Sequence, residues 1–565
     1  MKRKSLITLL LSIAMTLVAC GNSTTASTDS ASAEKGTSVA DTGNSVGDAK
    51  DTSSSDWVPE ENTLPITDQG VELTIYCDFA GGARQVYNSM ADMDIVKQME
   101  KETGLKLSFV HPPENDDGTF FTTMIASGDY PDIIWNNFAT YPGGPTAAMD
   151  DGVILDSTEE IKKKGYYFKQ MLDQSDPEIK ERDIWSDDGR IIRFGTTFIP
   201  EYLNNRVHGG FLVRKDLLDE AGITELPETF DEYDAMFAAF KKAGVVPWTT
   251  AMKDWQYIAY SPVASGLDLT YRNQNVKDGK VKFSRCEPEY KTFLTVMNDW
   301  YKKGYFTSDS LTQSISESQK QFQAGEAGAI LCGSWEIVTL NSVLQANEPN
   351  ASVIALPFPR PNKGDHVGTH GVVMQAVEDA RMAYVSAKCQ HPEEAVRFID
   401  YLYKPETIMM TAWGVNTDDH TLWTEDENGK RSWTDFMTNN PDFDYEIGRQ
   451  RYTANVLQGS WETNMEKLQY DNDYVQQAWK AWSEETDNAD LPSKFMTQTT
   501  DEAREISQLR TQIDTYGDEN VFAFITGERS LDEFDSFVEE LKGLGTDRLC
   551  ELYQAAYDRY LARGE

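Results

Sequence analysis

Strand patterns and helix patterns alternate through the first part of the folded chain, and this alternation constrains the fold more than any other feature. Residues 71–77 (VELTIYC) and 105–111 (LKLSFVH) read as strands, and residues 94–103 between them have helical spacing. Residues 119–127 predict a second helix, and residues 131–135 (PDIIW) predict a short buried strand. A β-α-β-α-β order favours a mostly parallel sheet with helices on both faces. We therefore expect an α/β fold.

A second alternating set begins near residue 209, where GGFLVRKDLL passes from a strand pattern to a helix pattern. Thr229 and Glu232 have the spacing of a capping box, which predicts the start of a helix that ends at Gly244. Helical spacing returns over residues 530–560. The chain has 565 residues, more than one hydrophobic core normally supports, so we expect at least two lobes and a helical C-terminal extension.

Residues 423–433 predict a β-hairpin with its turn at Asn428 and Gly429, because Asn-Gly is a strong short-range hairpin signal. A two-residue turn would pair opposite charges across the strands, namely Glu427 with Lys430 and Asp426 with Arg431. The same acidic spacing is similar to a calcium loop, but a lysine stands at the third ligand position. We therefore interpret the segment as a hairpin and expect no metal there.

The N-terminus has the layout of a signal peptide. Lys2, Arg3 and Lys4 precede an apolar run that ends at residue 19 and is shorter than the about 18 to 20 residues of a membrane-spanning helix. The following Cys20, in LVACG, resembles the cysteine of a bacterial lipobox, which carries diacylglycerol and is palmitoylated in mature lipoproteins. We expect residues 1–19 to be the signal and the lipid to hold the protein on the outer face of the cytoplasmic membrane. The alternative is an ordinary secretory signal.

Composition predicts a flexible linker after Cys20, and the net charge excludes nucleic acid as a partner. Residues 20–62 are rich in Ser, Thr, Ala, Gly and Asp, cannot bury enough apolar surface to order themselves, and predict a flexible linker. The formal net charge is -40, so the surface repels nucleic acid and we expect no such partner. Five cysteines remain besides Cys20, and an odd, scattered set does not indicate a disulfide framework.

Four segments, in this order, resemble the family 1 extracellular solute-binding proteins that deliver sugars to ABC importers. They are IASGDYPDII at residues 125–134, LVRKDLLDEAGI at 212–223, FQAGEAGAILCGSWE at 322–336 and HPEEAVRFIDYLY at 391–403. Residues 413–415 (WGV), 524–545 and 552–560 resemble a narrower branch, the large lipoproteins that bind aldouronates and other oligosaccharides. Residues 413–421 are less glycine-rich than the matching segment of that branch.

The resemblance implies a two-lobe, periplasmic-binding-protein-like fold of type II, with discontinuous lobes joined by a hinge and the ligand in the cleft between them. The order of the motifs places residues 64–199 and 368–413 in lobe 1, and residues 200–367 and 414–565 in lobe 2. The expected partners are an oligosaccharide and the ABC permease subunits. We expect a monomer that requires no cofactor.

Sugar sites combine flat aromatic faces with polar side chains that meet the hydroxyl groups. Trp335 and Glu336 follow a predicted strand, at a place where the resemblance implies a sugar-stacking aromatic, and Trp135 and Asn136 end the PDIIW strand. Each tryptophan has the alternative role of a core residue. Other cleft-edge candidates are Arg84, Glu201, Tyr202, Asp254, Trp255, Gln256, Arg360, His370 and Trp413.

Two chemical alternatives are weaker. His366 and His370 are four residues apart, but Gly368 and Gly371 oppose the helix that would bring both onto one zinc ion, so we expect no metal site. An extracellular glycosidase, or another polysaccharide-processing enzyme, needs a defined pair of carboxylates. No motif or spacing selects such a pair, which favours a binding protein over an enzyme.

Overall fold

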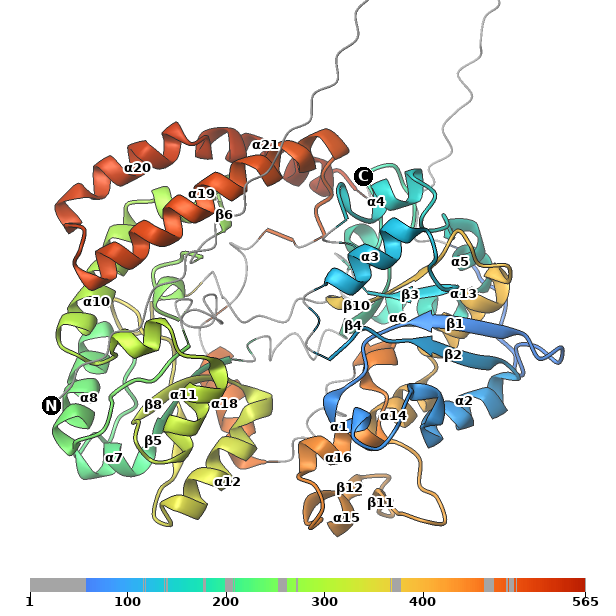
Figure 1. Ribbon diagram of the computed structural model, residues 1–565, viewed down its shortest axis with the longest axis horizontal. Helices are drawn as coiled ribbons and strands as arrows, with labels where there is room; N and C mark the ends of the chain where they lie inside the picture. Colours follow the sequence, from blue (N-terminus) through green and yellow to red (C-terminus); the bar gives the residue numbers. More distant parts are fainter. Residues whose placement is uncertain are drawn as a thin grey trace, which may run out of the picture. The chain divides into compact units, whose positions relative to one another are not determined.

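The protein was analysed as a computed structural model (Figure 1). The structure describes residues 57–565 with gaps at residues 115, 117, 137, 139–140, 176–178, 199–206, 208, 252–261, 271–272, 366, 368–376, 462–471, 484–485, 487–491, 494 and 564–565. The predicted signal, Cys20 and most of the predicted linker lie outside the described residues. No helix in the described ranges is both long and apolar enough to cross a membrane.

The larger sheet has six strands in the order β13-β4-β10-β3-β1-β2. Their bounds are β1 Glu72–Tyr76, β2 Lys106–Val110, β3 Ile133–Trp135, β4 Phe194–Phe198, β10 Val377–Val385 and β13 Ser460–Trp461. β1 pairs in parallel with β2 and β3, whereas β10 runs antiparallel to both β3 and β4. The predicted parallel β-α-β-α-β unit is confirmed. The interior strand β10 makes the sheet mixed, which the local pattern did not predict.

Two helices connect the parallel strands. α2 (Asp94–Thr103) leads from β1 to β2, and α3 (Thr119–Ser127) leads from β2 back to β3 on the other side of β1. α2 buries Ile95, Val96 and Met99 and stops at Gly104, whose φ of 73° suits a residue without a Cβ. The strand order therefore reverses direction at β1, between β2 and β3.

The smaller sheet has β5 (Gly209–Arg214) at its centre, with β8 (Ala329–Gly333) and β9 (Val353–Ala355) antiparallel on its two sides. All six residues of β5 are buried. Helices α7 (Lys215–Glu220) and α8 (Phe230–Ala243) follow β5. The capping box at Thr229 and Glu232 and the left-handed cap at Gly244 are confirmed. This sheet has cores of its own, so the chain forms two α/β lobes.

The remaining elements flank these two sheets. A hairpin of β6 (Gln274–Lys277) and β7 (Lys280–Phe283) precedes α10 (Glu289–Lys302). The other helices are α1 Gly81–Arg84, α4 Gly144–Asp150, α5 Thr158–Lys164, α6 Tyr166–Gln174, α11 Ile315–Gln323, α12 Ile337–Asn347, α13 Pro392–Tyr401, α14 Pro405–Trp413, α15 Asp435–Thr438, α16 Tyr445–Tyr452 and α18 Asp473–Ser483. The chain is therefore rich in helix around two compact sheets.

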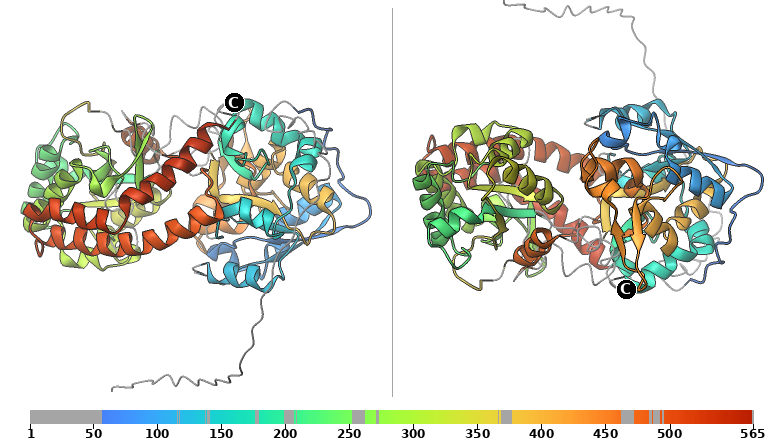
Figure 2. Two further views of the ribbon diagram at one scale, coloured as in Figure 1. Left: turned by 90° about the horizontal axis from the view of Figure 1, so that it is seen from above. Right: turned by 90° about the horizontal axis from the view of Figure 1, so that it is seen from below.

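The C-terminal extension is helical, as predicted. It consists of α19 (Thr500–Thr526), α20 (Phe534–Gly543) and α21 (Thr546–Leu561), which pack against one another (Figure 2). α19 and the start of α21 pack into the core of the smaller sheet. At the end of α21, Tyr560 joins the core of the larger sheet, and its hydroxyl donates to Oδ1 of Asp183 at 2.6 Å. One helix therefore contributes to both cores.

The predicted lobe boundary at residue 414 differs from the structure. β13 pairs with β4 of the larger sheet, and Ala454 and Leu457 lie in the core of that sheet. The backbone N–H of Gly82 donates to Oε1 of Gln450 at 2.7 Å, which ties α16 to α1. Residues 414–461 thus extend the first lobe. The lobe to which a segment belongs depends on its packing with distant segments, and the order of the motifs does not reveal that packing. The other predicted boundaries stay predictions.

The predicted linker ends earlier than residue 62. The side chain of Asn62 is buried and donates through Nδ2 to Oδ2 of Asp400 at 2.9 Å. Burial raises the pKa of the Asp400 carboxyl to about 6. The ring of Trp57 lies edge-on to that of Trp185, with a centroid separation of 6.0 Å. Residues 57–62 therefore belong to the folded body. Their polar composition predicted a linker, but the ring of Trp57 and the buried amide of Asn62 pack against the larger sheet's lobe.

The hairpin forms, but its register differs from the prediction by one residue. β11 (Trp423–Glu425) pairs with β12 (Arg431–Trp433), and Glu425 lies opposite Arg431. The carboxylate of Asp426 accepts the N–H groups of residues 428 and 430 at 2.9 Å, and Gly429 has a φ of 80°. The turn is therefore a three-residue loop with a left-handed glycine, because the aspartate side chain bonds the loop backbone.

Candidate ligand-binding site

A cavity of about 560 Å³ lies beyond the carboxyl ends of the three parallel strands of the larger sheet. It is lined by Tyr76, Asp78, Phe79, Ala80, Gly81, Pro112, Pro113, Glu114, Asp116, Gly118, Phe121, Trp135, Asn136 and Val456. All of these residues except Val456, which lies between α16 and β13, end or follow β1, β2 and β3. In open α/β sheets, ligands bind outside the carboxyl ends of the strands at the point where the strand order reverses, which here is β1.

Trp135 and Asn136, which the sequence analysis proposed, both line this cavity. Trp135 is only 4% exposed, so most of its ring is packed in the core. Its indole N–H is buried and has no hydrogen-bond partner in the described part of the chain. A buried donor without a partner costs roughly 1 to 3 kcal/mol.

Side-chain hydrogen bonds hold β1 and β3 side by side below the cavity. The carboxylate of Asp132 accepts the backbone N–H of Thr74 at 2.8 Å and its hydroxyl at 2.7 Å. In return, the hydroxyl of Thr74 accepts the N–H of Asp132 at 3.0 Å. The strand ends that carry the lining residues are therefore fixed relative to each other.

Arg84 joins the two loops that border the cavity, and it does not line the cavity. Its Nε donates to the carbonyl of Phe79 at 2.7 Å, and its Nη2 donates to the carbonyl of Pro112 at 2.6 Å. These loops follow β1 and β2. The structure thus gives Arg84 a positioning role, and its predicted contact with ligand stays a prediction.

The three carboxylates of the cavity were not predicted from the sequence. Asp78, Glu114 and Asp116 all line it. The loops that carry them approach closely, since a Cβ on Gly81 would lie 2.8 Å from Oε1 of Glu114. A detectable signal was the acidic run that directly follows the second predicted strand. Carboxylates at this edge can accept hydrogen bonds from ligand hydroxyl groups.

Trp335 and Glu336 lie at the end of β8 in the smaller sheet. Trp335 is 44% exposed, whereas Trp135 at the end of β3 is 4% exposed. The carboxylate of Glu336 accepts the backbone N–H of Gly333 at 2.8 Å and a hydrogen bond from Gln319. Burial raises the pKa of the Glu336 carboxyl to about 7. The buried acid holds the turn that carries Trp335. The half-exposed indole lies over Gly333, since a Cβ on Gly333 would lie 2.4 Å from the ring.

Two other candidates are buried. Trp413 is fully buried, and its ring packs against that of Trp433 with centroids 4.4 Å apart. Arg360 is 1% exposed and donates through Nη1 to the carbonyl of Asp365 at 2.6 Å. Their contact with ligand stays a prediction, and their burial argues against it. The remaining candidates lie outside the described residues: Cys20, Glu201, Tyr202, Asp254, Trp255, Gln256 and His370.

Several solved structures share this fold. An HMO-binding, ABC-transporter-associated solute-binding protein from Bifidobacterium longum infantis is 17% identical, covers 87% of this chain and 99% of its own, and has a TM-score of 0.71. The fructo-nystose complex of an EF-hand mutant of FusA from S. pneumoniae has 20% identity, the same coverage and a TM-score of 0.67. The alginate-binding protein AlgQ2 has 19% identity, the same coverage and a TM-score of 0.65.

Sequence comparisons define the family. An uncharacterised protein in the butB 5′ region of Niallia circulans is 23% identical over 265 residues, which are 46% of this chain and 94% of that protein. Residues 88–409 match the family described as bacterial extracellular solute-binding protein. That match covers more than half of the chain and includes most of the strand ends at the cavity. The chain is therefore a member of the bacterial extracellular solute-binding protein family.

Proposed function

We propose that the protein captures an oligosaccharide at the strand-end cavity and delivers it to the permease subunits of an ABC importer. The observation that carries the proposal is the composition of this cavity. One tryptophan, one amide and three carboxylates meet at the edge of a sheet where ligands bind in this fold class. A ligand with many hydroxyl groups both donates and accepts hydrogen bonds, so it matches this mixture of donors and acceptors.

Trp335 supplies the second part of the proposed site. Its exposed indole is a flat apolar face with one donor, which suits the C–H face of a sugar ring. We propose that hinge closure of the two lobes places this face against the sugar. The similar proteins are named for HMO, fructo-nystose and alginate, which supports an oligosaccharide as the ligand class.

A screen of the purified body against an oligosaccharide array, followed by calorimetry, tests the proposal. We expect a saturable ligand whose binding raises the melting temperature, because it binds only the native state. Asn136→Ala removes the amide that lines the cavity, so it should weaken binding without unfolding the protein. Failure of all neutral and acidic oligosaccharides to bind would contradict the proposal.

Closure of the lobes is tested by solution scattering. We expect a smaller radius of gyration at saturating ligand, since a ligand shifts the equilibrium only by binding the closed form more tightly. An unchanged radius at saturation would contradict hinge closure.

A glycosidase remains the second candidate, because Asp78, Glu114 and Asp116 line the same cavity. Incubation with the bound oligosaccharide separates the two. A receptor returns the ligand unchanged, whereas a glycosidase releases shorter sugars. We propose a non-catalytic receptor, for which product formation would be the contrary result.

We further propose that the protein is held on the outer face of the cytoplasmic membrane by a lipid on Cys20, and that it acts as a monomer. Multiple acyl chains anchor a protein far more stably than one chain does. Cys20→Ala should move the protein from the detergent phase to the aqueous phase in a phase-partition assay. Equal partition of wild type and variant into the aqueous phase would refute the anchor.

A further inference from the structure

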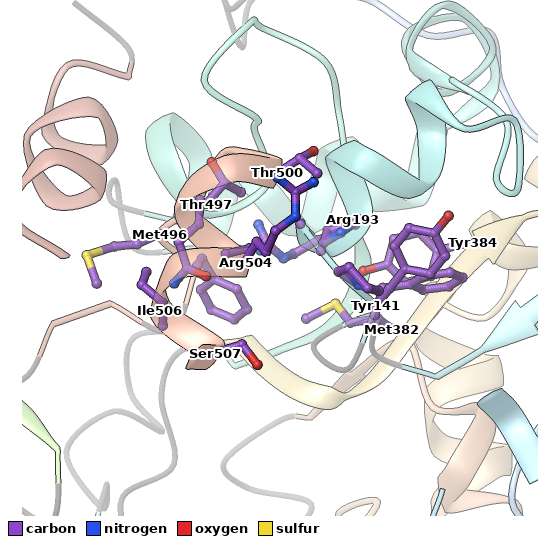
Figure 3. A pocket seen from close by; sticks show the side chains of 18 of the residues that line it. Tyr141, Arg193, Met382, Tyr384, Met496, Thr497, Thr500, Arg504, Ile506 and Ser507 are labelled. Atoms are coloured by element: carbon purple, nitrogen blue, oxygen red, sulfur yellow. The ribbon is translucent and has the colours of Figure 1, made fainter. Parts of the chain in front are cut away.

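A second cavity, of about 870 Å³, shares no lining residue with the first (Figure 3). One wall comes from the larger sheet and its loops and includes Tyr141, Arg193 and Tyr384, and the other is the start of α19 with the segment before it, including Phe495 and Arg504. The walls are in contact, because a Cβ on Gly143 would lie 3.2 Å from the hydroxyl of Thr500. The cavity is therefore bounded by directly packed segments.

The central polar group of this cavity is the guanidinium of Arg193. The residue is 7% exposed. Its Nη1 donates to the carbonyl oxygen of Asp183, and its guanidinium lies over the ring of Phe495 at 4.3 Å from the centroid. No ion pair in the described part of the chain includes it. A guanidinium carries five N–H donors, so this buried cation keeps unused donors at the cavity wall.

The nearby acids bond to other groups. Oδ1 of Asp183 accepts the hydroxyls of Tyr560 at 2.6 Å and Ser493 at 3.3 Å. The carboxylate of Asp187 pairs with Arg559 of α21 and with Arg563, which follows that helix. Burial lowers the pKa of Arg193 to about 10, although the nearby charge of Asp183 favours the guanidinium. A buried charge that forms no ion pair is costly. An anion in the cavity would offset that cost.

The rest of the lining describes the shape and polarity of the occupant. Tyr141, Met382 and Met496 provide apolar surface, and Ser507 provides a hydroxyl. Arg504 is a second cation on the rim, but it is already paired with Asp501 at 2.8 Å. A ligand that combines one carboxylate with an apolar ring face fits this set, because carboxylates accept paired hydrogen bonds from arginine.

We propose that this cavity is a second ligand site, which binds a small ring-bearing carboxylate through Arg193 and is separate from the oligosaccharide cavity. The carboxylate accepts the unused guanidinium donors, and the ring lies against Tyr141 and Met382. The net charge of -40 does not prevent this, since charges more than about 8 Å away are screened at physiological salt. The ring can belong to a sugar acid or to an aromatic acid.

Titration calorimetry of the mature chain separates these sources. The carboxylate probes are D-glucuronate and benzoate, and their neutral counterparts are D-glucose and benzyl alcohol. We expect one or both carboxylates to bind and the matching neutral compound to bind at least about tenfold more weakly, given the strength of charge-assisted hydrogen bonds. Absence of binding by both carboxylates, or equal binding by the neutral compounds, would overturn the proposal.

Variants locate the binding. Arg193→Lys keeps the charge but loses the planar fork, so we expect about tenfold weaker binding, and Arg193→Gln should abolish binding. Arg548→Gln removes the same charge from an exposed position on α21 and should leave carboxylate binding unchanged. Ala503→Phe fills the cavity from α19 without changing Arg193. This variant tests the same site if the Arg193 variants do not fold.

Carboxylate binding that persists unchanged in Ala503→Phe, or in a folded Arg193→Gln protein, would also overturn the proposal. Oligosaccharide binding is measured separately in Trp335→Ala, which should not alter carboxylate binding. The two proposals can therefore fail independently.

Discussion

Trp135 and Trp335 occupy similar places in the two sheets, yet the structure uses them differently. Trp135 ends β3 of the larger sheet, and Trp335 lies two residues beyond β8 of the smaller sheet. The first is 4% exposed and the second is 44% exposed. β3 is covered on both sides by neighbouring strands, whereas Trp335 lies in a 3₁₀ turn past the last residue of its strand.

The comparison shows that position at a strand end does not decide what an aromatic side chain can offer a ligand. The ring of Trp135 packs in the core, and its indole N–H is buried without a partner in the described part of the chain. Trp335 retains an open ring face. We therefore expect changes at Trp135 to act mainly on folding and changes at Trp335 to act mainly on affinity.

The largest effect should follow from Trp135→Ala. Removal of a buried aromatic ring leaves a cavity and costs about 3 to 5 kcal/mol of unfolding free energy. Denaturant unfolding without ligand measures it, and Trp335→Ala is the matched control, for which we expect a loss below about 1 kcal/mol because the ring is half-exposed. Similar losses in the two variants would remove the distinction between the two sites.

The next effect concerns affinity. Trp335→Ala removes a stacking face that should contribute on the order of 2 kcal/mol, which is roughly a thirtyfold weaker Kd. Calorimetry with the oligosaccharide identified in the array measures it, and Trp335→Phe should recover part of the loss. A variant with normal affinity and a sharply lower melting temperature would instead identify Trp335 as a core residue.

A smaller effect should come from Gly333→Ala. The new Cβ would lie 2.4 Å from the Trp335 ring, so the indole has to move. We expect about 1 kcal/mol weaker oligosaccharide binding, half of what full removal of the stacking face costs, with little change in stability, because the displaced ring is half-exposed. Gly333→Ala added to Trp335→Ala should have no further effect on affinity. An additive loss would show that the two positions act separately.

A further expected effect depends on pH. Burial raises the pKa of the Glu336 carboxyl to about 7, above its ordinary value of 4.5, so the native state holds this proton more tightly than the unfolded state does. The stabilisation is complete below pH 4.5 and is lost as the pH rises through about 7. The change should stay below about 1.4 kcal/mol per pH unit, the limit for one proton.

Denaturant unfolding of wild type and Glu336→Gln across this pH range measures the effect. Asp400 also has a raised pKa, of about 6, and contributes in the same direction, so the difference between the two proteins isolates Glu336. Identical pH profiles would show that Glu336 does not titrate in this way.

Much of the fold follows from local sequence patterns. Alternation predicted β1, β2 and β3, and a capping box with a following glycine predicted α8. The candidate site was predicted in part, because Trp135 and Asn136 end a recognisable strand. Asp78 and Asp116 were missed, because their proximity depends on two loops that meet only in the folded sheet.

The sequence by itself determined the element types, the two sheets and the helical extension, since periodicity and capping act over a few neighbouring residues. Only the tertiary structure decided that Trp135 is buried and Trp335 is exposed, that Arg84 bonds two loop carbonyls, and that residues 414–461 join the larger sheet. Exposure and hydrogen-bond partners depend on segments far apart in the chain. Such partners leave no periodic signal, so the packed structure alone assigns them.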